Sequence, residues 1–369
     1  MLSLYIDNKE GSTMRKLVME KAAIKNNLAV IKEKADGAVV YGVLSSDGGG
    51  TGIVPLARIL RDEGIGHFAV SEVSEAAALR RAGFVEEEIL MLRSTTDRAE
   101  LEQLLELNVV FTVSSVDTGL ALNALAENRS TVVEAHIQVD TGMGFGGFLV
   151  SEPEKVLLAY RSLPKVALSG IYTQLHAVAV DDPETRQQLE QFQTVLDTVH
   201  AAGFETGVIH AAGSFALLHN EETRLDGVRA GSAILGRCRR TRGDKLETVG
   251  YGEAALAEVR WLPKDHTLGA AEKPVVLKKP TRIAVLPVGY THGFGVSPIR
   301  ESGLFALWRR LRSERMRRVS IGGSKVKILG GIGASETILD VTDVKCSAGD
   351  IARFDIDPMF ARGFEREFR

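Results

Sequence analysis

The chain has 369 residues, of which 44% are hydrophobic and 25% are charged. Lys and Arg number 45 against 48 Asp and Glu, so the formal net charge of −3 favours neither nucleic acid nor an anionic membrane as a partner. The two cysteines, Cys238 and Cys346, lie far apart, which excludes a disulfide framework and a cysteine-built metal site. The sequence has no apolar run long enough for a membrane span and no signal-peptide pattern. We therefore expect a cytoplasmic protein.

Between residues 20 and 236, short apolar runs alternate with amphipathic stretches. Such runs are typical of buried parallel strands, and several of the amphipathic stretches end in glycine, as helices do at their C-caps. Together they predict an α/β fold of the (β/α)8 TIM barrel type, with an open doubly wound sheet as the alternative. The predicted strands are Ala38–Leu44, His67–Val70, Glu88–Leu92, Val109–Val113, Val133–Asp140, Ala167–His176, Val208–Ala212 and Asp226–Leu235.

After about residue 245 the pattern changes to β-rich segments broken by glycine and proline. We therefore expect the barrel over residues 15–245 and a mostly β C-terminal domain over residues 246–369, which the N-terminal segment 1–14 joins. A helical insert at residues 304–318 carries six arginines. Because no aromatic side chains alternate with these charges, a solvated helix face is favoured over an anion-binding patch.

The last two predicted strands are followed by Gly213-Ser214 and Gly231-Ser232. Barrels commonly bind phosphate with backbone N–H groups after these strands, and small residues allow the close approach that this needs. We therefore predict an anion site at Ser214, Gly231 and Ser232. The alternative is that both dipeptides only form tight barrel turns.

The ordered segments resemble the alanine racemase family, which are barrel-type enzymes that use pyridoxal phosphate. The resemblance covers nearly the whole chain from about Arg15 and implies a barrel, a C-terminal β domain and a head-to-tail homodimer with active sites at the shared interface. Arg229 stands where the family has a strand-8 arginine, and Tyr290 where it has a tyrosine acid/base acting in the partner's site. The segments that carry the resemblance are MEKAAIKNNLAVIKEKA, FAVSEVSEAAALRRAG, VDTGMG, RLDGVRAGSAILG, TRIAVLPVGYTHGF and LDVTDV.

Several positions depart from the pattern of this family. The lysine that forms a Schiff base with pyridoxal phosphate falls on Ser45, whose hydroxyl cannot form an imine. The arginine expected to bond the pyridine nitrogen falls on Phe145, and the histidine beside the ring falls on Gln174. From these departures we expect no pyridoxal phosphate and no racemisation of alanine. Further departures fall on Gly49, Thr51, Gln138, Gly213, Ala334 and Ser335.

The resulting hypothesis is an enzyme that works without pyridoxal phosphate on a ligand larger than alanine. The change to smaller residues, as at Ser45 and Gly49, would enlarge the former racemase pocket. One alternative is a catalytically inactive pseudoenzyme that binds a small anionic ligand or pairs with an active paralogue as a heterodimer. A third interpretation is a residual pyridoxal-phosphate-dependent amino-acid racemase.

Candidate catalytic residues are polar groups at the strand ends and in the C-terminal domain, because a histidine with a carboxylate or phenol can perform general acid–base catalysis. His136 and His210 lie within strands and are expected to be structural. A metal site from His176, His210 and an aspartate lacks a close ligand spacing, so no metal is predicted. The predicted catalytic residues are Tyr290, His292, Asp140 and His176, and the predicted ligand-binding residues are Ser214, Gly231, Ser232, Arg229, Ser45 and Asp47.

Overall fold

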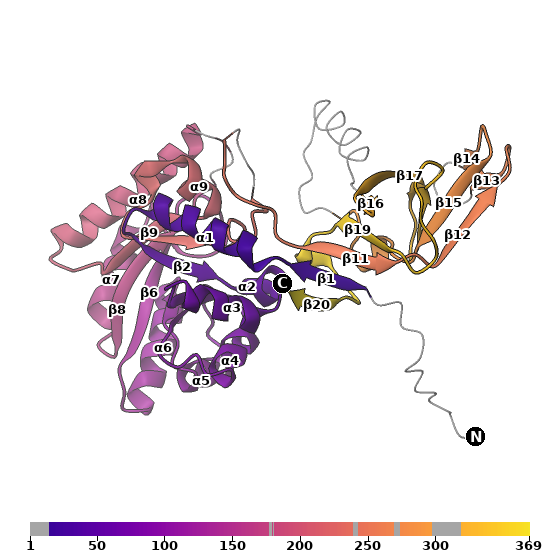
Figure 1. Cartoon of the computed structure of the whole chain (residues 1–369). Coiled ribbons are helices and arrows are strands. Elements are labelled where there is room, and N and C mark those ends of the chain that lie inside the picture. Colours follow the sequence, from indigo (N-terminus) through magenta and orange to yellow (C-terminus); the bar gives the residue numbers. More distant parts are fainter. Residues whose placement is uncertain (1–14, 177–178, 180, 239–242, 269–273, 297–318) are drawn as a thin grey trace, which may run out of the picture. The chain divides into compact units, whose positions relative to one another are not determined.

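The computed structural model describes the whole chain except residues 1–14, 177–178, 180, 239–242, 269–273 and 297–318 (Figure 1). Its contacts divide the chain into a barrel unit, Lys21–Val249, and a β unit, which joins the segment up to Glu20 to Gly250–Arg369. The predicted arginine-rich helix at 304–318 and the predicted role of residues 1–14 lie outside the described residues. Within the described part, no helix is long and apolar enough to cross a membrane.

The barrel unit contains a closed ring of eight parallel strands. The pairing order is β4-β3-β2-β10-β9-β8-β6-β5, and a bridge between Leu90 and Val110 closes it between β4 and β5. The predicted TIM barrel is therefore confirmed. The strands are β2 (Val39–Val43), β3 (His67–Val70), β4 (Glu88–Met91), β5 (Phe111–Val113), β6 (Val133–Asp140), β8 (Val166–Thr173), β9 (Val208–Ala212) and β10 (Gly227–Ala230), and the short β7 (Phe148–Leu149) pairs with β6.

Helices connect these strands on the outside of the barrel (Figure 1). Their starts carry local signals: the side chain of Asp97 accepts a hydrogen bond from Glu100 N at the start of α5, and Ser115 accepts one from Thr118 N at the start of α6. The helices are α1 (Lys21–Ala35), α2 (Ser45–Gly49), α3 (Ile53–Asp62), α4 (Val73–Arg81), α5 (Arg98–Glu106), α6 (Val116–Asn128), α7 (Pro153–Ser162), α8 (Pro183–Ala201) and α9 (Ser214–His219), with a 3₁₀ turn η1 (Glu221–Thr223).

The barrel interior holds an apolar cluster beside buried polar side chains, since His210 stacks on Tyr41 and Arg229 is the register partner of Tyr41. Tyr41, Ala69, Leu90 and Val110 are buried against one another, with Val43, Leu92 and other partly buried side chains packed on them. Because side chains alternate along a strand, residues two positions further on share this inward direction. The strand predicted over Asp226–Leu235 ends at Ala230, since the chain turns at Gly231.

The β unit is built from one long, mostly antiparallel sheet. Its order is β12-β15-β18-β17-β16-β19-β11-β1-β20, with β1 and β20 parallel, and β13 pairs with β14. Leu262, Leu268, Leu277 and Ile283 form a buried cluster in this unit. The strands are β1 (Lys16–Met19), β11 (Tyr251–Ala255), β12 (Glu258–Leu262), β13 (Thr267–Leu268), β14 (Val275–Val276), β15 (Thr281–Leu286), β16 (Val319–Ile321), β17 (Ser324–Ile332), β18 (Thr337–Asp340), β19 (Ile351–Asp355) and β20 (Glu365–Phe368), with 3₁₀ turns η2 (Tyr290–His292) and η3 (Pro358–Phe360).

Candidate functional site

Ser45, at the end of β2, begins a left-handed turn. Ser46, Asp47 and Gly48 have φ of 58°, 56° and 64°, a region that costs non-glycine residues roughly 1–2 kcal/mol each. The predicted ligand-binding residue Asp47 supports this turn, because its Oδ1 accepts from Ile53 N at 2.9 Å. The hydroxyl of Ser45 lies 2.7 Å from the hydroxyl of Ser71 at the end of β3.

Glu75 holds this turn against the neighbouring strand. Its carboxylate is largely buried and accepts from the backbone N–H groups of Asp47 (3.2 Å), Ser71 (3.0 Å) and Glu72 (3.1 Å). The ends of β2 and β3 are thereby fixed to each other by one side chain. Sequence reasoning missed Glu75, although its position at N3 of α4 is typical of a capping box.

The predicted anion site lies at the ends of β9 and β10, which we call the phosphate cradle (Ser214, Gly231 and Ala233). Ser214 Oγ accepts from Gly231 N at 3.0 Å and from Ala233 N at 3.1 Å. The hydroxyl proton of Ser214 is therefore left to donate to another acceptor. Gly231 packs against β2, where an added Cβ would come within 3.2 Å of Val43, and Ser232 beside it is exposed.

Arg229 does not project into solvent but lies in the barrel interior, 4% exposed. Its guanidinium donates to His210 Nδ1 at 2.6 Å, to Thr173 O at 2.7 Å and to Gln174 Oε1 at 3.1 Å. Burial lowers the pKa of Arg229 to about 10, so the group stays charged at neutral pH. Arg229 thus places a fixed positive charge beneath the barrel mouth.

The two strand histidines form one buried hydrogen-bonded pair, His136 Nδ1 to His210 Nε2 at 2.9 Å. His210 is also stacked between Tyr41 and Tyr172. Burial, and then the charge of Arg229, lowers the pKa of His136 to about 4 and that of His210 well below its usual value. Both rings are therefore neutral at physiological pH, which fits a structural role.

Asp140 ends β6 and shapes the loop that follows. Its carboxylate accepts from Gly142 N at 2.9 Å and from Gly144 N at 3.1 Å. The loop raises Phe145 out of the protein surface, 77% exposed. The hydrogen bonds that the structure gives Asp140 are thus those of a loop-forming residue.

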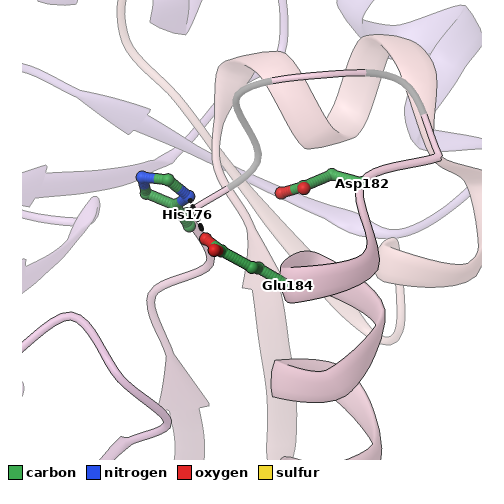
Figure 2. Close-up of side chains that lie close together, drawn as sticks. All are labelled: His176, Asp182 and Glu184. Atoms are coloured by element: carbon green, nitrogen blue, oxygen red, sulfur yellow. Dashed lines mark ion pairs between the residues drawn. The ribbon is translucent and has the colours of Figure 1, made fainter.

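The predicted catalytic residue His176 lies at the rim of the barrel, beyond β8. Figure 2 shows its ring beside Glu184 and near Asp182, with Nδ1 3.2 Å from Glu184 Oε2. The candidate ligand atoms of these three residues lie within 4.8 Å of one another. Asp182 and Glu184 stand at the N-cap and in the first turn of α8, where carboxylates complement the helix dipole.

The two histidines of the possible metal site, His176 and His210, take up different positions in the barrel unit. His176 is exposed at the rim, whereas His210 is fully buried and bonded to Arg229 and His136. A shared site of His176 and His210 is therefore not formed.

The β unit holds the other two predicted catalytic residues in the turn η2. The side chain of Tyr290 is 56% exposed. His292 Nδ1 accepts from Gly289 N at 3.1 Å, which leaves its proton on Nε2. Burial, and then the nearby charge of Arg15, lowers the pKa of His292.

Comparison with known proteins identifies both units. Residues 19–238 match the family model for the alanine racemase N-terminal domain, and residues 251–354 match that for the C-terminal domain. The chain is 29% identical over 337 residues to an alanine racemase of Desulfosudis oleivorans, covering 87% of this chain and 82% of the relative. It is also 29% identical over 328 residues to one from Desulforamulus reducens, covering 86% and 83%.

Solved structures share the fold at lower identity. Alanine racemase from Streptomyces lavendulae superimposes with a TM-score of 0.84 at 21% identity, covering 98% of each chain. The enzyme from Bartonella henselae, described with covalently bound pyridoxal phosphate, superimposes with a TM-score of 0.80 at 20% identity, covering 96% of this chain and 99% of that one.

These matches correct the functional hypothesis drawn from the sequence. The expectation of an enzyme that needs no pyridoxal phosphate is wrong, and so is the alternative of an inactive pseudoenzyme, because both units match alanine racemases. That expectation depended on single side chains such as Ser45 and Phe145.

Proposed function

The chain belongs to the alanine racemase family, and we propose that it is an amino-acid racemase that uses pyridoxal phosphate. The observation that carries this proposal is the match of both units to the family over most of the chain. Relatives named alanine racemase make a small amino acid the first substrate to test.

The phosphate cradle supports binding of the cofactor. The Ser214 hydroxyl and the small residues Gly231 and Ser232 suit a phosphate group, which the positive charge of Arg229 also favours. When bound, pyridoxal phosphate supplies an electron sink for the bond that breaks at the α-carbon. The chain's own residues hold the cofactor and move the proton.

The end of β2 does not fit a covalent link to the cofactor. We infer that Ser45 occupies the position of the lysine in the family, and a hydroxyl offers no amine for an imine. We therefore propose that this chain holds the cofactor by non-covalent contacts alone, with its phosphate in the cradle. Release of the cofactor on dilution or dialysis follows from this binding mode.

For proton transfer we propose Tyr290, with His292 beside it. An exposed phenol can carry a proton, and the lowered pKa of His292 keeps that imidazole neutral and able to exchange one. As the family resemblance implies, Tyr290 of the partner subunit then serves each barrel in a head-to-tail homodimer. His176 and Asp140 are second candidates at the barrel mouth, and a cytoplasmic location remains a prediction.

One experiment tests the proposal directly. The purified chain is titrated with pyridoxal phosphate while absorbance is recorded, and conversion of L-alanine to D-alanine is followed by chiral chromatography. Saturable binding that is weaker in Ser214→Ala, together with D-alanine that appears only with cofactor present, supports the proposal. The proposal is refuted if neither alanine nor any other small amino acid is converted to its D-enantiomer at saturating cofactor.

A further inference from the structure

Four serines line one half of the barrel mouth. Ser45, Ser71, Ser94 and Ser114 follow the consecutive strands β2, β3, β4 and β5. Each lies two residues beyond a side chain that faces the barrel interior: Val43, Ala69, Leu92 and Thr112. All four serines come just after the carboxyl ends of these strands, and two hydroxyl contacts join them in pairs; we call them the serine wall.

The serine wall is made of two hydroxyl pairs. Ser45 Oγ lies 2.7 Å from Ser71 Oγ, and Ser94 Oγ lies 2.5 Å from Ser114 Oγ. All four side chains are partly exposed. In such a pair one hydroxyl donates and the other accepts, and either can rotate to exchange these roles. A third hydroxyl can therefore join each pair as donor and acceptor together.

Two charged side chains close to the serine wall are engaged by other groups. The carboxylate of Glu75 is occupied by backbone N–H groups. Arg93 bonds Glu100 and the carbonyl of Ser71. The four groups of the wall are themselves neutral hydroxyls that can donate and accept hydrogen bonds.

The backbone beneath the wall is held in a costly conformation. Ser46 and Asp47 stay left-handed because Glu75 and Ile53 bond the turn from both sides. Strain of this kind persists where the surroundings over-determine a position, and it gathers at functional sites. The turn fixes Ser45 at the mouth before any ligand arrives.

We propose that the serine wall binds the side chain of the substrate, and that this side chain carries a hydroxyl group, as in serine. The inference rests on the proposed amino-acid racemase function and names its substrate class. The phosphate cradle, which would hold the cofactor phosphate, lies at the ends of β9 and β10, so the side of the mouth formed by β2–β5 would be left for the amino acid. Alanine offers only a methyl group there, and a site built for a hydroxyl loses its hydrogen bonds to such an analogue.

Equilibrium binding tests this inference by a readout that does not depend on the rate of racemisation. Dissociation constants for L-serine and L-alanine are measured by calorimetry on the full chain saturated with pyridoxal phosphate, for wild type, Ser71→Ala, Ser114→Ala and the control Ser162→Ala. Ser162 lies on α7 and donates to Leu158 O, away from the mouth. We expect serine to bind at least about five-fold more tightly than alanine, the worth of one neutral hydrogen bond. Each mouth variant should weaken serine by about that factor and leave alanine unchanged, and the control should change neither.

Two results would overturn the inference: equal or tighter binding of alanine in the wild type, or mouth variants that weaken both amino acids alike. Failure of the proposed function has a different signature. If serine binds preferentially but neither amino acid is racemised, the subsite stands and the racemase proposal fails. If alanine is racemised and serine does not bind, the racemase stands and the subsite fails.

Discussion

Arg229 fixes the proton of His210 by a hydrogen bond of 2.6 Å from its guanidinium to Nδ1. A guanidinium only donates, so Nδ1 must accept and the ring proton of His210 must lie on Nε2. His210 then donates to Nδ1 of His136, which places the second ring's proton on its own Nε2. One arginine thus orders two imidazoles across strands β10, β9 and β6.

The first prediction concerns acid stability. The pKa of His136 is about 4 in the folded chain against 6.5 in the unfolded chain, so at intermediate pH the unfolded state binds the additional proton. Neutral His136 therefore makes its whole contribution to the free energy of unfolding above about pH 6.5. This contribution, roughly 3 kcal/mol, is lost as the pH falls towards 4. Urea unfolding of wild type and His136→Asn at several pH values measures the difference, because Asn can accept from His210 but does not titrate. Parallel pH profiles for the two proteins would contradict the assignment.

The second prediction concerns the buried charge. Arg229→Met should lower the free energy of unfolding by about 3–5 kcal/mol, because it leaves His210 and the carbonyl of Thr173 without a donor. Arg224→Met, whose guanidinium pairs with the exposed Glu221, is the matched control and should cost about 1 kcal/mol or less. Denaturant unfolding measures both variants, and equal losses would show that the interior network has no special weight.

The third prediction concerns the phosphate cradle. Ser214→Ala removes the acceptor of two backbone N–H groups, so the free energy of unfolding should fall by about 1–2 kcal/mol. The affinity for pyridoxal phosphate should fall about ten-fold, because the hydroxyl that would contact the phosphate is lost. Ser214→Thr keeps the hydroxyl and is the control. Absorbance titration and thermal unfolding supply the two measurements. Unchanged cofactor affinity in the alanine variant would remove the cradle from the site.

The fourth prediction concerns Glu75 as a positioning residue. Glu75→Ala frees the backbone N–H groups of Asp47, Ser71 and Glu72, so these amides should exchange with deuterium faster while those of β9 keep their protection. Glu75→Gln retains one oxygen acceptor and should show an intermediate rate. If the exchange at Asp47 and Ser71 is unaltered, the turn after β2 holds its shape without Glu75.

The fifth prediction concerns Tyr290. If its phenol carries a proton, Tyr290→Phe should lower kcat for racemisation by about 100-fold or more, with the affinity for pyridoxal phosphate unchanged. Light scattering should give the mass of a homodimer for wild type and variant alike. A fully active Phe variant removes Tyr290 from the chemistry, and a monomer at micromolar concentration removes the proposed assembly.

Three strands of the barrel have the predicted bounds: His67–Val70, Val133–Asp140 and Val208–Ala212. Each is mostly buried, and its hydrophobic residues form a local pattern that the sequence shows directly. The strand predicted to reach Leu235 stops at Ala230, where the chain turns and Gly231 N donates to Ser214 at the start of α9.

The side-chain arrangement of the mouth was less accessible to sequence reasoning. The pairs Ser45–Ser71 and Ser94–Ser114 depend on strand register, which single residues do not reveal. Single residues also do not reveal that His210 is buried inside the barrel while His176 is exposed at its rim. The prediction that the chain uses no cofactor depended on aligned single positions such as Ser45 and Phe145, and the matches of both units to alanine racemases contradict it.

The closure of the barrel between β4 and β5 has a mechanical consequence. The two strands meet at a single bridge, Leu90 with Val110, and two backbone hydrogen bonds hold it: Met91 N to Val110 O and Val110 N to Ile89 O. Ser94 and Ser114 follow β4 and β5, and the hydrogen bond between their hydroxyls links the two strand ends beyond this bridge. We therefore expect local opening of the barrel to begin between β4 and β5, on the side of the mouth where Ser94 and Ser114 lie.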